Sequence, residues 1–449
     1  MAAPAINHVF VLMLENRSYD SLFGWSNFTG LTPDGTPTTA NGLPAEGVTN
    51  IGRTGQPYKL GNNPPFFLGL DPGHEFTDVA VQLCGDSVAS TADVVNDRLV
   101  LAGGKYPPLV TSDTQTGFAC SYEDTGASVA DTFSAFSPSQ LPVLNFLASQ
   151  FAVCDNWFSS VPGPTWPNRF FATAGTSSGL DHSPSSAQVT ESTVFNLPVF
   201  PFPNGTIFSK LPTAADWLVV QGDVSQCLSL PGMHAHLPQF VQMSELLSRL
   251  QKGSLEARFV FIEPKYDAAN DFRNGNSMHP SGDVRNGEAL IKTLYDAISS
   301  STYWANSVFL IVFDEHGGFF DHVSPPAAVP PGAPEKASLK THDFSFDRYG
   351  VRVPAVVVSP FVRAGTIDHT LYDHTSIMKT VDTLLNLNGA LDLTDRVRAA
   401  QDFSKILSLS SPRPDAPACP EPVGTGGEVP SSSGAPRSKE PFLPLYAHH

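Results

Sequence analysis

Acidic and amide side chains follow two apolar segments of the sequence at the points where those segments stop. Glu15 and Asn16 come directly after one run, and Asp314 and Glu315 follow another. Such a group is negative and rich in oxygen, and a divalent cation relieves its internal repulsion most simply. Oxygen ligands suit magnesium, calcium or manganese, and a nearby histidine would also permit zinc or iron. The alternative is that these residues are ordinary solvated loop acids.

Thr165 lies in the segment 162–171, which reads PGPTWPNRFF. Prolines on both sides fix the backbone and an amphipathic stretch follows, so we predict that a helix begins at Thr165. Free N–H groups and the positive end of the helix dipole favour an anion there, such as a phosphoryl group. The hydroxyl beside a metal is a plausible nucleophile, or it only caps the helix. Arg169, one turn on, would clamp phosphate or form a salt bridge.

Histidines supply the third element of a reactive site. Those near strand ends and Gly/Pro turns are His74 in DPGHE, His279 in MHP, His316 after the acidic pair, and His322 in GGFFDHV. Imidazoles donate to phosphate oxygens or protonate a leaving alkoxide. Each one alone is more often a satisfied loop residue, but their grouping favours chemistry. His234 and His236 in GMHAH are weaker candidates for substrate contact.

The elements that must position these residues can be read from hydrophobic patterns. Four continuous apolar runs, at 8–14, 259–262, 308–313 and 353–358, are typical of strands buried on both faces, as in a parallel sheet. Helical patterns occur at 240–250, 287–299 and 374–387. This alternation predicts an α/β fold with a mostly parallel central sheet flanked by helices. In such folds the carboxyl ends of the strands converge on the site.

Two long segments rich in Gly, Pro and Asn, at 27–70 and 320–345, are expected to form loops over the site. From residue 408 the sequence becomes rich in Pro, Gly and Ser and cannot bury a core. We therefore predict a single catalytic domain at 1–407 and a disordered tail at 408–449.

The net charge disfavours two classes of protein, and the cysteine spacing gives no sign of a metal site. Lys and Arg number 26 against 43 Asp and Glu, a formal net charge of −17. A nucleic-acid binder needs a basic surface, so that class is disfavoured, as is electrostatic docking on an anionic membrane. The five cysteines show no metal-binding spacing, and whether any of them is bridged stays open.

No apolar stretch approaches the ~18 residues that a transmembrane segment needs. The apolar run near the start of the chain lacks a preceding basic segment, so we expect no signal peptide here. Sequons at Asn27 and Asn204 and a low lysine content favour a secreted or extracytoplasmic location. The expectation is a soluble protein whose oligomeric state is open.

Six motifs in one order resemble a known family. They are ENRSYD at 15–20, DPGH at 71–74, PTWPNR at 164–169, His279-Pro280, DEHGGFFDHV at 314–323 and YDHTS at 372–376. Over about 6–390 the chain resembles the phosphoesterase family of phosphatidylcholine-hydrolysing phospholipases C and an acid phosphatase. The resemblance implies an alkaline-phosphatase-like fold.

The resemblance also implies roles for individual residues. One divalent metal ion would be bound at the positions of Glu15, Asn16, Asp314 and Glu315. The Ser or Thr nucleophile of the family matches Thr165, and His74 and His279 would bind the phosphoryl group or assist the leaving group. His322 is assigned a catalytic role as well, and Arg169 and His316 are assigned to substrate binding.

The chain departs from the family at Ser281, where a second proline usually follows the His-Pro pair, and it lacks the β-rich C-terminal domains of the bacterial enzymes. We expect a metal-dependent phosphoric ester hydrolase acting on a small phosphate ester or a phospholipid head group. Cleavage of diesters, as by phospholipase C, and of monoesters, as by acid phosphatase, both stay open. The Phe-rich stretches at 64–68 and 195–202 would form an apolar rim for lipid or pack under loops.

An inactive relative that binds phosphorylated ligands is the alternative from another class. Sulfatase chemistry is disfavoured because Thr165 is not a Cys or Ser in a C/S-x-P-x-R setting.

Overall fold

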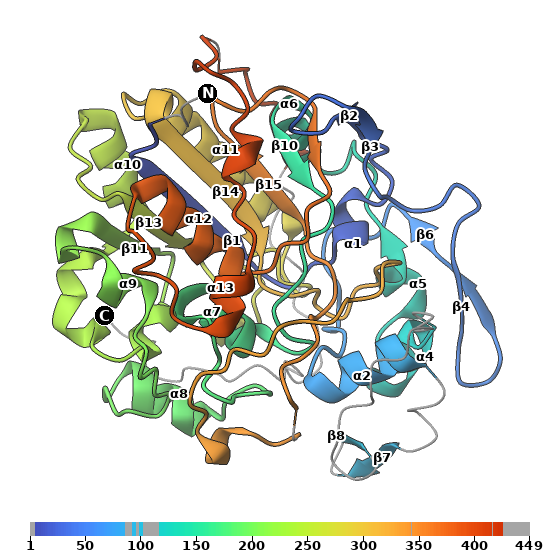
Figure 1. Cartoon of the computed structure of the whole chain (residues 1–449). Helices are drawn as coiled ribbons and strands as arrows, with labels where there is room; N and C mark the ends of the chain where they lie inside the picture. The colour runs from blue at the N-terminus through green and yellow to red at the C-terminus, as the bar shows by residue number, and fades with distance from the viewer. Residues whose placement is uncertain are drawn as a thin grey trace.

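A ten-stranded sheet forms the centre of the molecule, and the computed structural model describes residues 5–85, 92–95, 98–101, 116–342, 344–414 and 416–424 (Figure 1). Its strands, in spatial order, are β12 (Phe240–Gln242), β11 (Trp217–Gln221), β13 (Phe259–Glu263), β1 (His8–Leu14), β14 (Ser307–Phe313), β15 (Ala355–Val358), β10 (Ala152–Cys154), β16 (Thr366–Asp368), β2 (Thr29–Leu31) and β3 (Pro37–Thr39). Every residue of β1 and β14 is buried, as the continuous apolar runs predicted.

Most neighbouring strands are parallel. The five strands from β12 to β14 all run in one direction. The run at 353–358 was expected to form a parallel strand, and this is wrong: β15 is antiparallel to both β14 and β10. An apolar run reports that a strand is buried on both faces, but it carries no information on direction. The sheet is thus mostly parallel, with one reversed strand near its middle.

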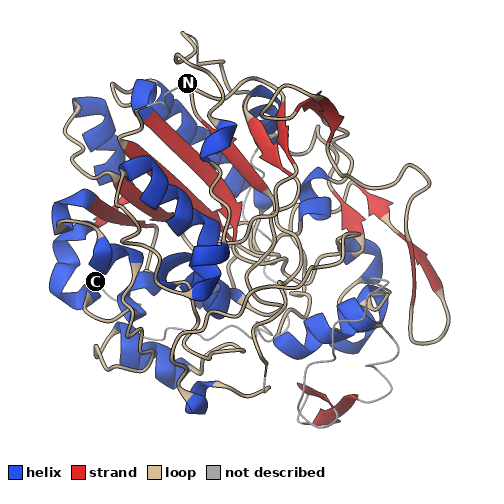
Figure 2. Ribbon diagram, viewed as in Figure 1, coloured by secondary structure: helices blue, strands red, loops and turns tan. Residues whose placement is uncertain are grey.

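Helices flank the sheet, as Figure 2 shows. The longer ones are α2 (Phe76–Cys84), α4 (Phe118–Thr125), α6 (Pro142–Gln150), α7 (Thr165–Ala174), α8 (Ser186–Thr193), α10 (Met243–Lys252), α11 (Val284–Ser299) and α12 (Thr375–Leu385). The shorter ones are α1 (Tyr19–Phe23), α5 (Val129–Thr132), α9 (Ile207–Lys210) and α13 (Asp395–Ala399). The three predicted helices match α10, α11 and α12, although residues 240–242 form β12 before α10 begins. The α/β class with a mostly parallel, helix-flanked sheet is therefore confirmed.

The segment 27–70 is more regular than expected. It contains β2 and β3, which extend the central sheet, and the short strands β4 (Thr49–Ile51), β5 (Pro57–Lys59) and β6 (Gly61–Asn62). The segment 320–345 is irregular, with one 3-10 turn at Ala337–Leu339. Three further short strands, β7 (Ala92–Val95), β8 (Arg98–Leu101) and β9 (Ser134–Ala135), lie outside the central sheet.

The first part of the predicted tail forms hydrogen bonds with the domain, and the domain boundary at residue 408 stays a prediction. The N–H of Leu409 donates to the Phe361 carbonyl at 2.9 Å, and the Arg413 guanidinium donates to the Gln150 carbonyl at 2.7 Å. The Tyr295 hydroxyl donates to the Pro417 carbonyl at 2.7 Å. A Pro-rich segment cannot form a core, but its carbonyls can still bond to a surface that is already folded. Residues 425–449 lie outside the described part of the chain.

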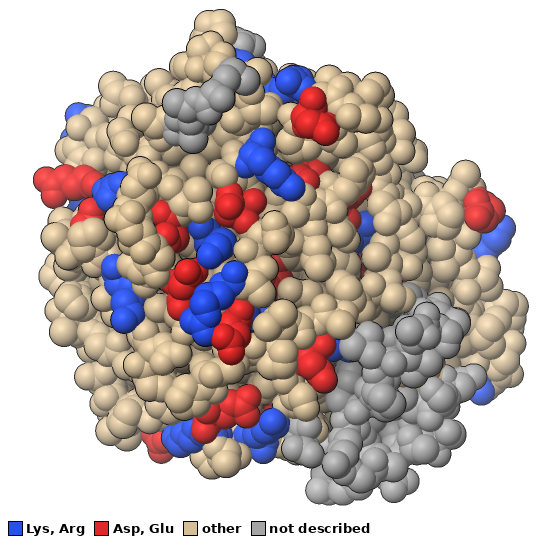
Figure 3. All heavy atoms as spheres, in the orientation of Figure 1, with Lys and Arg blue, Asp and Glu red and all other residues tan. Residues whose placement is uncertain are grey.

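Among the described helices, none is long and apolar enough to cross a membrane. On the face drawn in Figure 3, the described basic and acidic side chains are interspersed rather than gathered into a basic patch. That face therefore lacks the basic patch that would bind the phosphate backbone of a nucleic acid.

Candidate active site

The predicted acidic group lies at the carboxyl ends of two neighbouring parallel strands. Leu14 at the end of β1 pairs with Phe313 at the end of β14, so the next residues of both strands meet. The side chains of Glu15, Asn16, Asp314 and Glu315 are at most 1% exposed. One Asp314 oxygen, Oδ1, accepts from the Asn16 N–H at 3.0 Å and the Glu315 N–H at 2.7 Å. These acids are not solvated loop residues.

Thr165 is the first residue of α7, and Pro164 is its N-cap. The Thr165 hydroxyl donates to the Asn16 side-chain oxygen at 3.2 Å, and the Asn16 amide nitrogen lies 3.4 Å from Nε2 of His74. The Nδ1–H of His74 donates to the Pro72 carbonyl at 2.9 Å, which leaves Nε2 as the acceptor. Asn16 thus joins the predicted nucleophile to a predicted histidine.

The turn before Thr165 is held by one side chain of the helix that follows it. Oδ1 of Asn168 accepts from the Val161 N–H at 3.0 Å, and its amide nitrogen donates to the carbonyls of Gly163 and Pro164, both at 3.0 Å. Because Asn168 is fully buried, this bonding fixes the backbone that presents the Thr165 hydroxyl.

Arg169 bonds to the acidic group and to the end of β1. Its Nε donates to Oδ2 of Asp314 at 2.8 Å, and its Nη2 donates to the Leu14 carbonyl at 3.1 Å. Burial by itself lowers the pKa of Arg169, but the neighbouring Tyr266, Asp314 and Glu15 outweigh it and raise the pKa. Of the two roles expected for Arg169, the structure shows the salt bridge, which holds Asp314 in place.

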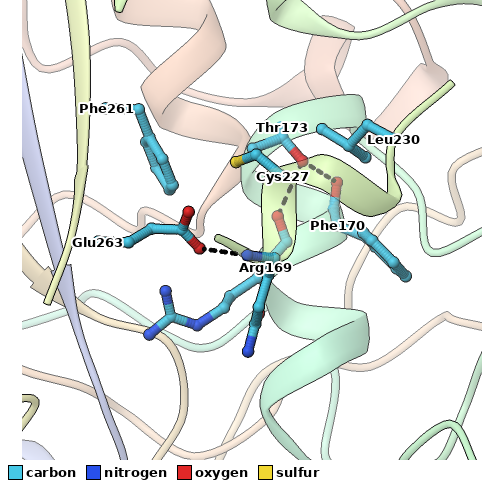
Figure 4. Close-up of a pocket in the computed structure, with 8 residues that line it drawn as sticks. Arg169, Phe170, Thr173, Cys227, Leu230, Phe261 and Glu263 are labelled. Atoms are coloured by element: carbon cyan, nitrogen blue, oxygen red, sulfur yellow. Dashed lines mark hydrogen bonds between the residues drawn. The ribbon is translucent and has the colours of Figure 1, made fainter. Parts of the chain in front are cut away.

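Arg169 also lines a small pocket (Figure 4). Phe170, Leu230 and Phe261 line it with apolar side chains, and Glu263 contributes a carboxylate. Glu263 accepts from the Gln226 N–H at 3.1 Å and the Tyr266 hydroxyl at 3.3 Å, and burial raises its pKa. Glu263 is the last residue of the apolar strand β13, and these hydrogen bonds hold its carboxylate against Gln226 and Tyr266.

His279 is fully buried beside Asp71. Its ring stacks on Phe272 with centroids 3.6 Å apart, and Nε2 lies 3.7 Å from Oδ2 of Asp71. The same carboxylate oxygen lies 3.8 Å from Nδ1 of His74. Burial, together with the charge of Arg17, lowers the pKa of His279 well below its ordinary value. The structure therefore brings His74 and His279 together around one carboxylate.

His316 faces Glu315. Nε2 of His316 bonds to Oε1 of Gln82 at 2.8 Å, and Nδ1 lies 3.3 Å from Oε2 of Glu315. Gln82 is itself oriented, because its amide nitrogen donates to the Gly73 carbonyl at 2.7 Å. Burial lowers the pKa of His316 well below its ordinary value. The predicted substrate contact of His316 stays a prediction.

His322 lies in a network with Asp20 and Asn41, and its predicted catalytic role stays a prediction. Its Nδ1 lies 2.6 Å from Oδ2 of Asp20, and its Nε2 lies 3.1 Å from Oδ1 of Asn41. Asp20 is also bound by Arg352 at 3.0 Å, and Arg352 pairs with Asp321 at 3.1 Å. In this network His322 pairs with a buried carboxylate that Arg352 also holds.

His234 and His236 lie on one short helix, and their predicted contact with substrate stays a prediction. They lie in the 3-10 helix Met233–Gln239, where the His236 ring packs edge-on against Trp217. Trp217 is the first residue of β11, whereas the site lies at the opposite, carboxyl ends of the strands. The GMHAH motif does not indicate which end of the central sheet its histidines will lie against.

Several residues near the site were missed by the sequence reasoning. Asp71 and Arg17 lie inside motifs that the resemblance used, but neither was given a role. His374 was missed in the same way: its Nε2 bonds to the Asp314 carbonyl at 2.5 Å, which fixes the end of β14. Gln82 lies in no motif, and its contact with His316 spans 234 positions. Only the fold could reveal it.

Comparisons with known proteins agree on one family. Residues 6–388 match the model of the phosphoesterase family. Non-specific phospholipase C6 of Arabidopsis thaliana is 32% identical over 92% of this chain and 74% of its own length. Non-specific phospholipase C3 of the same plant is 30% identical over 93% and 76%. Phospholipase C B of Mycobacterium tuberculosis (strain ATCC 25618 / H37Rv) is 27% identical over 84% and 72%.

A search of solved structures gives partial matches, among them an alkaline phosphatase superfamily protein from Vibrio parahaemolyticus, with a TM-score of 0.32 and 15% identity over 55% of this chain and 60% of that one. Murine ectonucleotide pyrophosphatase/phosphodiesterase 5 gives a TM-score of 0.36 and 9% identity over 57% and 95%. The match to the family model spans nearly the whole described chain and includes the positions of the acids, the threonine and the histidines of the site. The chain therefore belongs to the phosphoesterase family and is a hydrolase of phosphoester bonds.

Proposed function

We propose that the chain cleaves phosphoric esters by attack of the Thr165 hydroxyl, assisted by a divalent metal ion. The observation that carries this proposal is the bond from the Thr165 hydroxyl to Asn16 at 3.2 Å, at the start of α7 and beside buried acids. A helix N-terminus favours the charge of a phosphoryl group. The placement of the hydroxyl goes beyond helix capping, because it bonds to a side chain of another element.

The acidic group fits a divalent cation in donor type and charge. Glu15, Asp314 and Glu315 bring three buried carboxylates to the site, and Arg169 pairs with Asp314 alone among them. Taking charged carboxylates out of water costs several kcal/mol each, so a cation that balances three of them is favoured. Of the described residues, the group whose acid and imidazole atoms all approach within 4.8 Å is Asp20, Asp321 and His322. That group is a poor candidate, because Arg352 already pairs with both of its carboxylates.

Glu15, Asn16, Asp314 and Glu315 would hold the cation, which when bound would lower the pKa of a hydroxyl and offset phosphoryl charge. In the first step the Thr165 oxygen forms a bond to phosphorus and the bond to the departing alcohol breaks. An imidazole of the site assists the departing oxygen. In the second step water cleaves the phosphothreonine and frees the hydroxyl.

The names of the relatives favour phosphodiesters of the phospholipase C type as substrates. The structure divides the predicted apolar rim at 195–202: Phe195 is 63% exposed and Leu197 50%, whereas Phe200 and Phe202 are buried. Only the first two residues can meet lipid, and the others anchor the segment by packing against Phe170.

Hydrolysis of p-nitrophenyl phosphorylcholine and of p-nitrophenyl phosphate, each with and without a chelator, tests this proposal. We expect faster cleavage of the diester and loss of turnover with chelator, restored by added metal. Faster cleavage of the monoester would favour the acid phosphatase type. Turnover that survives the chelator would contradict the metal site. No turnover of either ester with metal added would favour the inactive relative that binds phosphorylated ligands.

A further inference from the structure

The imidazole of His279 is held rigidly in one orientation. Its ring lies nearly parallel to Phe272, with an interplanar angle of 10° and centroids 3.6 Å apart. The ring has no exposed surface. A side chain clamped in this way presents its two nitrogens in fixed directions.

The two nitrogens of His279 have different surroundings. The backbone N–H of Ser281 donates to Nδ1 at 3.3 Å, so Nδ1 is an acceptor and the ring proton is on Nε2. Among the described residues Nε2 has no hydrogen-bond partner, although it is buried. A buried N–H without a partner costs about 1–3 kcal/mol, which a ligand that accepts its hydrogen bond would recover.

The charges around His279 favour the neutral ring. Burial and the nearby guanidinium of Arg17 both oppose a positive charge on this ring. A proton on Nδ1 would also point at the Ser281 N–H and break that bond. The carboxylate of Asp71, 3.7 Å from Nε2, is the one acidic side chain paired with this ring in the described chain. The Asp71 carboxylate attracts the hydrogen on Nε2, which the neutral ring already carries. It therefore does not require a second proton on Nδ1.

Ser281 is the position at which this chain departs from the family pattern. A proline there would have no N–H to donate to Nδ1. The hydrogen bond that selects the Nε2–H form is therefore available because residue 281 is not a proline.

We propose that His279 is a neutral hydrogen-bond donor to a phosphoryl oxygen through Nε2–H, held in this form by the backbone N–H of Ser281, and that it does not donate a proton to the leaving group. Phe272 and Ser281 are then positioning residues. The imidazole keeps its hydrogen throughout, so no bond to it forms or breaks. The proton that the departing alcohol takes comes from another group. This inference rests on the proposed phosphoester chemistry.

The first test compares His279→Gln with His279→Leu. A glutamine amide nitrogen can replace an Nε2–H donor but cannot serve as an acid. For a neutral donor we expect His279→Gln to keep kcat/KM within about tenfold of wild type, and His279→Leu to lose about 100-fold or more, as when one oxyanion donor is removed. Equal losses in both variants, confined to esters with poor leaving groups, would show a proton donor and overturn the proposal.

The second test compares Ser281→Pro with the matched control Ser281→Ala, which keeps the backbone N–H. We expect Ser281→Pro to lower kcat/KM by about threefold to tenfold, the effect of losing one neutral hydrogen bond, and Ser281→Ala to change it little. Equal rates in Ser281→Pro and Ser281→Ala would show that this N–H does not select the active form.

Nitrogen-15 NMR of the labelled wild-type protein measures the protonation state and the tautomer of the His279 ring, and it requires no turnover. We expect His279 to stay in the neutral Nε2–H form from pH 5 to 8. A His279 resonance that titrates in this range, or that shows the Nδ1–H form, overturns the proposal. This reading holds even if the protein hydrolyses no ester, so failure of the proposed function and failure of this inference are distinguished.

Discussion

Replacing Thr165 with alanine should abolish turnover while the protein stays folded. The substitution removes a hydrogen bond worth about 1 kcal/mol and a buried methyl group worth about 0.8 kcal/mol. The side chain is fully buried, so both losses apply in full. The expected destabilisation of about 2 kcal/mol is smaller than the 5–15 kcal/mol that holds a typical domain.

The loss of activity should be far larger than the loss of stability. Without the attacking oxygen, kcat should fall by at least about 1,000-fold, which corresponds to about 4 kcal/mol of barrier. Thr165→Ser keeps the hydroxyl and loses only the methyl group, so it should retain kcat within about tenfold. Thr173→Ala is the matched control: Thr173 is buried on the same helix, and its hydroxyl donates to the Arg169 carbonyl at 3.0 Å. It should lose similar stability and keep its activity.

Three measurements test the assignment of Thr165 as the nucleophile. Urea unfolding gives the stability of each variant, and steady-state kinetics with p-nitrophenyl phosphorylcholine gives kcat. Mass spectrometry of a quenched reaction should find a phosphoryl group on the peptide that contains Thr165. The nucleophile assignment is refuted if Thr165→Ala retains the wild-type rate, or if both threonine-to-alanine variants lose activity in parallel with stability.

Three further substitutions test other parts of the structure. Arg169→Met should destabilise the fold by about 3–5 kcal/mol in urea, because it leaves the buried Asp314 carboxylate without its guanidinium; an unchanged midpoint would contradict that role. His322→Gln should keep kcat within about threefold, because His322 bonds to Asp20 and Asn41; a 100-fold loss would support its predicted catalytic role. Burial raises the pKa of Glu288 from its ordinary 4.5 to about 7, so the folded protein holds a proton that the unfolded chain releases. The free energy of unfolding should therefore fall by about 3 kcal/mol as pH rises through this window, and Glu288→Gln should remove that component; an identical pH dependence in the variant would contradict it.

Much of the fold and part of the site could be predicted from sequence for a local physical reason. The run at 8–14 and the run at 308–313 are apolar at every position, so each had to be a strand covered on both faces. A polar residue directly after such a strand has to lie at its carboxyl end. Adjacent, parallel placement of β1 and β14 then makes Glu15 and Asp314 neighbours. The helix start at Thr165 follows from the prolines around it.

The sequence could not show which end of the sheet a loop would reach. His322 and His236 look like the other loop histidines, yet one pairs with Asp20 and the other packs on Trp217 at the far end of β11. The sequence also could not show the direction of β15, because an apolar run indicates burial of a strand whichever way the strand runs.

The sequence by itself determined the kind of chemistry, because the types of side chain at the strand ends and at the start of α7 follow from short local patterns. The tertiary structure decided which partners those side chains have. Asp71 between His74 and His279, and the Ser281 N–H on the His279 ring, depend on where separate loops meet. The charge and tautomer of a buried group depend on such partners, so only the folded chain assigns them.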